Sequence, residues 1–495
     1  MATTMPALRH ACTASIIVSL RADIVDDDIE LADPLQGRLE ETFARRIDRV
    51  LCVFCLCQGT RRYAGCGTNR EGGGCRRLEP HRPIPFNGGP AMREDVAVQT
   101  SIVPGQADAG EDHLARVQRI AATIEAEAEA SERSLRLTPT LQAALHRQGL
   151  FRLLLPRPFG GFETDPPTFF QVIEEVAKHD ASTAWCLCQG NGCAMSAAYL
   201  DPEIAEEIWG RDPEAVLAWG PGARSQAIVE GDGYRLTGRW AFVSGGRRAN
   251  WLGGHASVIE ADGSPRRDVD GEIMVRTMLL PASEATWIDA WDVIGLRGTG
   301  SDSYEVKDLF VRRDHSIVRD DPAERRYQAP LYLFPQMSLY ASGFSGTALG
   351  IARAMLDSFT ELAVDKRPPL AKHTLRDTGM VQYEVAQAEA RIRAARALVL
   401  SELSDIWHEV VATQALSIAN RMRIRLASTF AIHEAKAAAD VAYDLAGATA
   451  IFLGNDFERR FRDIHTVTQQ QQGRKAHLQR VGAFLLGLPP DLAIA

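Results

Sequence analysis

The hydrophobic pattern along this chain of 495 residues changes its period twice. Apolar residues recur at helical spacing from residue 111, as at Leu114, Val117 and Ile120. From about residue 216 the period becomes that of short strands between turn residues, and after Pro330 it is helical again. The pattern therefore predicts a mainly α fold with a central β unit. The expected parts are a leader over 1–110, an N-terminal helical domain over 111–215, a middle β-barrel domain over 216–325 and a C-terminal long-helix bundle over 326–490.

Individual elements follow from the same periods. The apolar run 180–200, which contains Trp185, predicts a buried helix. Short strands with turns between them predict a small barrel or sandwich, and they are expected near 226–230, 234–244, 251–259, 273–280, 287–293 and 304–311. Long amphipathic stretches predict an antiparallel bundle with helices over 344–362, 375–411 and 416–446.

The leader differs from the rest in composition. It is rich in Arg, Gly, Pro and Cys, and 59–90 has no sustained period. The spacing of Cys52, Cys55 and Cys57 is compatible with zinc or an iron–sulfur cluster, but no His stands among these cysteines and no second CxxC pair follows. We therefore expect no metal site. We predict instead a disordered leader, or translated upstream sequence with the working start at Met92.

Charge and hydropathy restrict the partners. The formal net charge is -9, so neither nucleic acid nor an anionic membrane is expected to bind. No apolar run approaches the roughly 20 residues that a membrane helix needs. Nothing in the cysteine pattern requires disulfides, which favours the cytoplasm.

The most informative segment runs from Gly231 to Gly245, with the sequence GDGYRLTGRWAFVSG. A strand that carries Trp240 and ends in Ser244-Gly245 can place an indole beside a flat cofactor. It can also direct a hydroxyl and a backbone N–H toward ring heteroatoms. Alternation along the strand would put Trp240 and Ser244 on one face. The alternative is that these residues only close a turn.

This segment resembles the middle domain of the acyl-CoA dehydrogenase superfamily, in the form found in its oxygen-using, two-component (group D type) flavin-dependent monooxygenases. The resemblance covers about 112–490 and includes PFGG at 158–161, STAW at 182–185, GLRGTGS at 295–301 and FRD at 461–463. It implies reduced flavin as cofactor, FMN or FAD, delivered by a separate flavin reductase. It also implies a small aromatic or heteroaromatic substrate and a homo-oligomer, with a tetramer favoured.

The residue at the position of the expected base is unsuited to acyl-CoA dehydrogenation. Acyl-CoA dehydrogenases commonly carry a Glu that removes the α-proton, and its position falls on Gln471 here. There is no Asp or Glu from Ile464 to Leu478, and an amide cannot accept that proton. A dehydrogenase or oxidase with its base elsewhere stays open, as does a non-catalytic flavin-binding protein.

The hydroxylase branch often has two histidines, and their positions fall on Gln470 and Cys193. His465 is nearby and either lines the pocket or is structural. The four glutamines at 469–472 form either a solvated turn or hydrogen-bond partners for flavin and substrate. We take Ser244, Gln470 and His465 as the catalytic candidates.

The remaining candidates bind cofactor or substrate. The predicted cofactor-binding residues are Trp219, Trp240, Ser244, Gly245, Arg297 and Gln469. The predicted substrate pocket comprises Trp185, Gln189 and Cys193. No GxGxxG fingerprint lies between a strand and a helix, so a nicotinamide cofactor bound in that manner is not expected.

Overall fold

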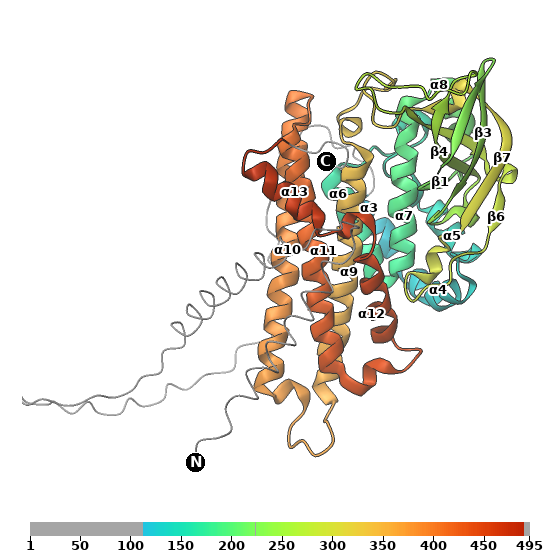
Figure 1. The fold of residues 1–495 in the computed structure, drawn as a ribbon. Coiled ribbons are helices and arrows are strands. Elements are labelled where there is room, and N and C mark those ends of the chain that lie inside the picture. Colours follow the sequence, from blue (N-terminus) through green and yellow to red (C-terminus); the bar gives the residue numbers. More distant parts are fainter. Residues whose placement is uncertain (1–111, 223, 490–495) are drawn as a thin grey trace, which may run out of the picture. The chain divides into compact units, whose positions relative to one another are not determined.

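The computed structural model describes residues 112–222 and 224–489. The predictions for the leader, for its cysteine spacing and for a start at Met92 concern residues outside that part of the chain. Within it, the order of elements is helices, a β unit and then long helices (Figure 1). The predicted fold class is confirmed.

The N-terminal helices begin where the sequence supplies caps. The side chains of Thr138, Asp165 and Asp180 each accept a hydrogen bond from a backbone N–H in the first turn of the helix that follows. The longer helices are α3 (His113–Gln118), α4 (Ala121–Ser134), α5 (Pro139–Arg147), α6 (Pro166–His179) and α7 (Ala181–Ala194). A short helix, α8 (Pro202–Ala205), follows them.

The β unit is an eight-stranded sheet coiled around a hydrophobic core of its own. Its strands are β1 (Leu217–Gly220), β2 (Gln226–Glu230), β3 (Gly233–Trp240), β4 (Trp251–Ile259), β5 (Val275–Pro281), β6 (Thr286–Ile288), β7 (Ser303–Arg312) and β8 (Ser316–Ile317). The order in the sheet is β6-β7-β3-β2-β4-β5-β8, and β1 pairs in parallel with β4. The predicted strands over 226–230 and 251–259 are confirmed. Strand β3 ends at Trp240, four residues before the predicted end at Ser244.

Long helices form the C-terminal bundle. They are α9 (Gln336–Asp365), α10 (Gly379–Thr413) and α11 (Ile418–Ala446), followed by α12 (Asp456–Val467) and α13 (Ala476–Leu485). The first half of α9 is buried almost all round because α6, α7 and α11 pack against it. None of the helices in 112–489 is long and apolar enough to cross a membrane.

Helix α7 joins the two halves of the described structure. It packs against α9 on one side and against β1 on the other, and Figure 1 shows it between the bundle and the sheet. All its residues except Gln189 are buried. Side chains on α7 are therefore placed to meet those of the β unit and the bundle.

Candidate functional site

The loop after β3 brings Ser244 to the boundary between the β unit and α7. The chain leaves the strand through Phe242 and Gly245, which have φ of 55° and 71°. A left-handed φ is unfavourable for most L-residues, so a glycine at 245 suits this turn. The N–H of Gly245 donates to the carbonyl of Thr299 at 2.8 Å, which fixes the loop on the segment before β7. Ser244 itself is only 7% exposed.

The Ser244 hydroxyl belongs to a chain of hydrogen bonds with one direction. Thr299 Oγ1 donates its single proton to the Leu296 carbonyl at 2.8 Å. Because that proton is used, Thr299 Oγ1 accepts from Ser301 Oγ, which lies 2.7 Å away. Ser301 Oγ in turn accepts the proton of Ser244 Oγ, also 2.7 Å away. Trp185 Nε1 donates to Ser244 Oγ at 3.0 Å. A hydroxyl oxygen has two acceptor sites, so Ser244 keeps one that no group in the described part of the chain occupies.

Trp185 connects this hydroxyl chain to an aromatic wall. Its indole stacks on Phe344 of α9 with ring centroids 3.9 Å apart, and Phe344 is stacked with Tyr340 at 5.8 Å. Trp185 and Phe344 are 8% and 4% exposed. The two stacked rings are buried where α7 meets α9.

A polar cluster follows one turn further along α7. Gln189 Nε2 lies 3.4 Å from both the Trp219 carbonyl and the Tyr340 hydroxyl. The Tyr340 hydroxyl also lies 3.5 Å from Cys193 Sγ. Burial raises the pKa of the Cys193 thiol to about 12 and that of the Tyr340 phenol well above its usual value, so both stay protonated and neutral. The cluster can bind a neutral polar group but offers no ionised partner at neutral pH.

A cavity opens on the other side of the Ser244 loop. It is small and partly open to solvent. The helical unit and the β unit both line it, with Leu137, Gln142, Phe151, Cys186, Ser244, Gly245, Arg247 and Thr299 among the lining residues.

The structure brings together six of the predicted residues: Trp185, Gln189, Cys193, Trp219, Ser244 and Gly245. Trp240 lies elsewhere. Its indole has no exposed surface, stacks on Tyr304 at 5.0 Å and donates to the His255 carbonyl, all within the β core. The prediction that Trp240 and Ser244 lie on one face of a strand was wrong. Strand β3 ends at Trp240, so the alternation of side chains does not continue through the loop to Ser244.

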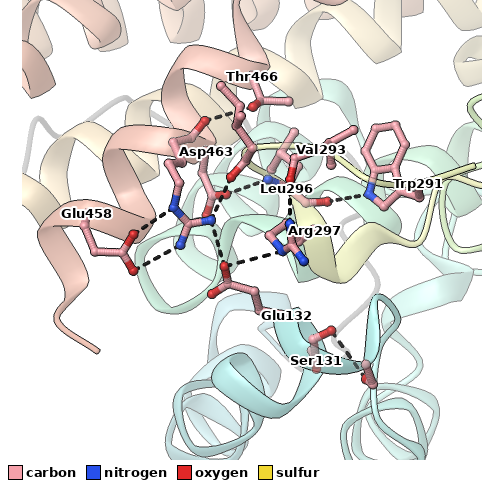
Figure 2. A network of polar contacts seen from close by, with 12 residues as sticks. Ser131, Glu132, Trp291, Val293, Leu296, Arg297, Glu458, Asp463 and Thr466 are labelled. Atoms are coloured by element: carbon pink, nitrogen blue, oxygen red, sulfur yellow. Dashed lines mark hydrogen bonds and ion pairs between the residues drawn. The ribbon is translucent and has the colours of Figure 1, made fainter. Parts of the chain in front are cut away.

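Arg297 lies in a polar network at the junction of three elements (Figure 2). Its Nη1 donates to the Val293 carbonyl at 2.7 Å, and its Nε lies 3.9 Å from Glu132 of α4. Arg462 of α12 contacts the same Glu132 at 2.7 Å. Through these contacts the Arg297 guanidinium links the loop before β7 to α4. Binding of the flavin phosphate by Arg297 stays a prediction.

The C-terminal candidates take different positions. His465 Nε2 is 3.0 Å from Asp440 of α11, and its ring packs on Phe461, so its described contacts are within the bundle. Gln469 is exposed and its amide lies 3.2 Å from Thr468 Oγ1. Gln470 accepts from the N–H of Gln472 through Oε1, while its Nε2 is buried without a partner among the described residues. Their catalytic or binding roles stay predictions.

Sequence reasoning missed four residues of this site. Thr299 and Ser301 stand in the GLRGTGS segment that carried part of the resemblance, but nothing in that segment pointed to a hydroxyl chain. Tyr340 and Phe344 lie four residues apart, which puts them on one face of α9. Helical spacing alone does not distinguish such a face from ordinary core.

The residues around Ser244 fit the edge of a flavin ring on one observation. Ser244 is buried, and its oxygen has an acceptor site that no group of the described residues occupies. The edge of an isoalloxazine carries hydrogen-bond donors, so it can fill such a site.

Comparisons with known proteins agree with this interpretation. The family model described as "Acyl-CoA dehydrogenase, C-terminal domain" matches residues 342–474. Indole-3-acetate monooxygenase of Acinetobacter baumannii is 32% identical over 352 residues, which is 70% of this chain and 86% of that protein. HsaA, the oxygenase subunit of a flavin-dependent monooxygenase of Rhodococcus jostii, is 28% identical over 71% of this chain and 92% of its own length.

Solved structures show the same fold. The crystal structure of the HsaA monooxygenase from Mycobacterium tuberculosis superimposes with a TM-score of 0.70 and 26% identity, covering 78% of this chain and 99% of the other. XiaF from Streptomyces, solved with FADH2 and glycerol, superimposes with a TM-score of 0.71 at 24% identity over 77% of this chain and 96% of its own. With the relative that is 32% identical, these matches establish that the chain belongs to the flavin-dependent monooxygenases with the acyl-CoA dehydrogenase fold.

Proposed function

We propose that this chain is the oxygenase component of a two-component monooxygenase that oxygenates a small aromatic or heteroaromatic molecule. A separate reductase supplies reduced FMN or FAD, because relatives of this chain are named as oxygenase subunits or oxygenase components, which implies a partner that reduces the flavin. The bound reduced flavin supplies the two electrons that activate O2. One oxygen atom enters the substrate and the other leaves as water, so each turnover uses one O2 and one reduced flavin.

The observation that carries the proposal is the free acceptor site of Ser244. Because its proton is directed to Ser301, the hydroxyl can only accept a hydrogen bond from a ligand. Reduced flavin carries a hydrogen on N5, whereas the same nitrogen of oxidised flavin is an acceptor. A site of this kind favours the reduced form, which is the form that an oxygenase component must capture from solution.

The substrate is expected to lie against Trp185 and Phe344, near the polar cluster. Aromatic rings pack well against such walls. Gln189, Cys193 and Tyr340 favour a neutral hydrogen-bonding group such as a ring N–H or a phenol O–H. Relatives include proteins named for indole-3-acetate, resorcinol and p-hydroxyphenylacetate, which supports indoles and phenols as first candidates.

Isotope labelling tests the proposal directly. The full-length chain would be mixed with reduced FMN or FAD and ¹⁸O2 in the presence of a panel of indoles and phenols, and the products analysed by mass spectrometry. We expect one ¹⁸O atom in the product of at least one compound. Reduction of oxidised flavin by an acyl-CoA under anaerobic conditions, with no labelled product, would favour the dehydrogenase or oxidase alternative.

The proposal includes a homotetramer in the cytoplasm. Exposed apolar side chains gather in the segment after α11, where Ile451, Phe452 and Leu453 are 63%, 67% and 86% exposed. Such a segment is typical of a surface that is covered by another subunit. The three cysteines of the described residues are buried free thiols, which suits a reducing compartment.

A further inference from the structure

Helix α12 holds the loop that precedes β7 through a buried carboxylate. Asp463 is 4% exposed, and its Oδ1 accepts a hydrogen bond from the backbone N–H of Leu296 at 2.6 Å (Figure 2). Leu296 has φ of 53°, in the left-handed region that a leucine rarely adopts. The bond to Asp463 therefore stabilises a backbone conformation that Leu296 would not favour by itself.

Close packing and a second side chain hold the same loop. Arg462 Nη1 donates to the Ile294 carbonyl at 2.7 Å, and Arg462 is itself held by ion pairs to Glu132 and Glu458. A Cβ added to Gly295 would lie 2.2 Å from the Arg462 carbonyl oxygen, so the loop backbone lies directly on α12. The backbone of Gly295 and Leu296 is thus held directly by α12.

The carbonyl of Leu296 begins the chain that orients Ser244. It accepts from Thr299 Oγ1 at 2.8 Å, from Trp291 Nε1 at 3.1 Å and from the backbone N–H of Thr299 at 3.1 Å. As long as Thr299 donates there, Ser301 must donate to Thr299 and Ser244 to Ser301. If the carbonyl moves away, the Thr299 proton becomes free to point to Ser301, and the whole chain can reverse.

We propose that Asp463 is a positioning residue that keeps the Ser244 hydroxyl an acceptor toward the ligand, acting through Leu296, Thr299 and Ser301. The inference rests on the proposed role of Ser244 in recognising reduced flavin. It adds that the selectivity of this site is set from α12 of the C-terminal bundle. With Asp463 removed, the reversed chain turns Ser244 into a donor, which suits oxidised flavin.

Two substitutions at Asp463 separate the hydrogen bond from the charge. Asp463→Ala removes the acceptor for Leu296, whereas Asp463→Asn keeps a carbonyl oxygen in nearly the same place. Arg460→Ala is the matched control, because Arg460 lies on α12 but donates to the Ala354 carbonyl and Ser358 of α9. All three would be made in the full-length chain.

Amide hydrogen exchange without flavin gives the first measurement. Asp463→Ala is expected to speed exchange at Leu296 and also at Gly245, whose N–H donates to the Thr299 carbonyl. Asp463→Asn and Arg460→Ala should leave both amides as in the wild type. Faster exchange at Leu296 with no change at Gly245 would overturn the proposal, because the loss of Asp463 would then not reach the loop that carries Ser244.

The second measurement is the ratio of the Kd for oxidised flavin to the Kd for reduced flavin. Asp463→Ala should lower this ratio by about fivefold, the equivalent of one neutral hydrogen bond. Asp463→Asn should restore it. An unchanged ratio in Asp463→Ala, at normal flavin binding, would contradict the proposal.

Thr299→Val interrupts the same chain if Asp463→Ala does not fold. It should lower the flavin ratio as strongly while leaving exchange at Leu296 unchanged, and a wild-type ratio in this variant would overturn the proposal. Failure of the proposed function shows itself separately. A wild-type chain that binds flavin but forms no labelled product contradicts the monooxygenase assignment, while the exchange and binding ratios still decide the role of Asp463.

Discussion

Ser244 combines two roles at the scale of a single residue. Its oxygen accepts from the buried indole N–H of Trp185, and we propose that the same oxygen offers an acceptor site to a ligand. A buried donor that loses its partner costs about 1–3 kcal/mol. Changes at Ser244 must therefore be separated into a loss of stability and a loss of ligand recognition.

The pair Ser244→Ala and Trp185→Phe achieves that separation. Ser244→Ala should lower the melting temperature, weaken binding of reduced flavin by about fivefold and shift turnover from product toward hydrogen peroxide. Trp185→Phe removes the N–H but keeps a ring against Phe344 and leaves the hydroxyl in place. It should keep the preference for reduced flavin. Equal ratios of product to peroxide in Ser244→Ala and the wild type would remove the role of Ser244 in oxygen chemistry.

At the scale of elements, the ring of Tyr340 on α9 packs directly against the backbone of α7 at Gly192. Gly192 makes this possible, since a Cβ there would lie 2.1 Å from Cε1 of Tyr340. The Tyr340 ring can then reach across to Gln189 and Cys193. The polar cluster of Gln189, Cys193 and Tyr340 depends on this contact.

Gly192→Ala should disturb the pocket more than the fold. We expect it to displace Tyr340, to destabilise the protein by about 1–3 kcal/mol as overpacked cores do, and to raise KM for the aromatic substrate. Gly190→Ala, whose Cβ would lie 3.1 Å from the Phe151 ring, controls for lost helix flexibility on the same element. Steady-state kinetics and thermal unfolding of both variants provide the check. A KM that rises equally in both would show that the contact with Tyr340 is not special.

The junction between α12 and the loop before β7 should respond to pH. Burial, reinforced by the nearby Asp180, raises the pKa of the Asp463 carboxyl to about 7, although Arg459 and Arg462 oppose this. An unfolded Asp has a pKa of about 4, so the folded state binds more protons between these values. The stabilisation is present below about pH 4 and is lost as the pH rises through 7.

Asp463→Asn tests this linkage because it keeps the hydrogen-bond acceptor but does not titrate. We expect its free energy of unfolding to fall less steeply than that of the wild type between pH 5 and 8. Urea unfolding at several pH values measures the two slopes. Parallel slopes would show that Asp463 has an ordinary pKa in the folded protein.

At the scale of the whole molecule, the exposed apolar segment after α11 predicts assembly. Light scattering should give four times the mass of the chain at micromolar concentration. Replacing Phe452 and Leu453 by serine should yield smaller species, whereas Val269→Ser, at a fully exposed site in the β unit, should leave the mass unchanged. A monomeric wild type, or a double variant of unchanged mass, would argue against this interface.

The sequence by itself determined the order and type of the elements. Helix starts at Pro139 and Pro166 could be predicted because their caps act within one turn of chain. Strands β2 and β4 followed from alternation and turn residues, which are equally local. The absence of a carboxylate from Ile464 to Leu478 also needed no structure to weigh against acyl-CoA dehydrogenation.

Only the tertiary structure decided which side chains meet. Trp240 entered the β core because the strand ended there and Tyr304 of β7 lay opposite it. Ser244 acquired its direction as an acceptor from Ser301 and Thr299, more than 50 residues away along the chain. Hydrogen-bond direction and ring stacking depend on distances between elements. Local period carries no such information, so the site emerged only when α7, α9 and the loops of the β unit were brought together.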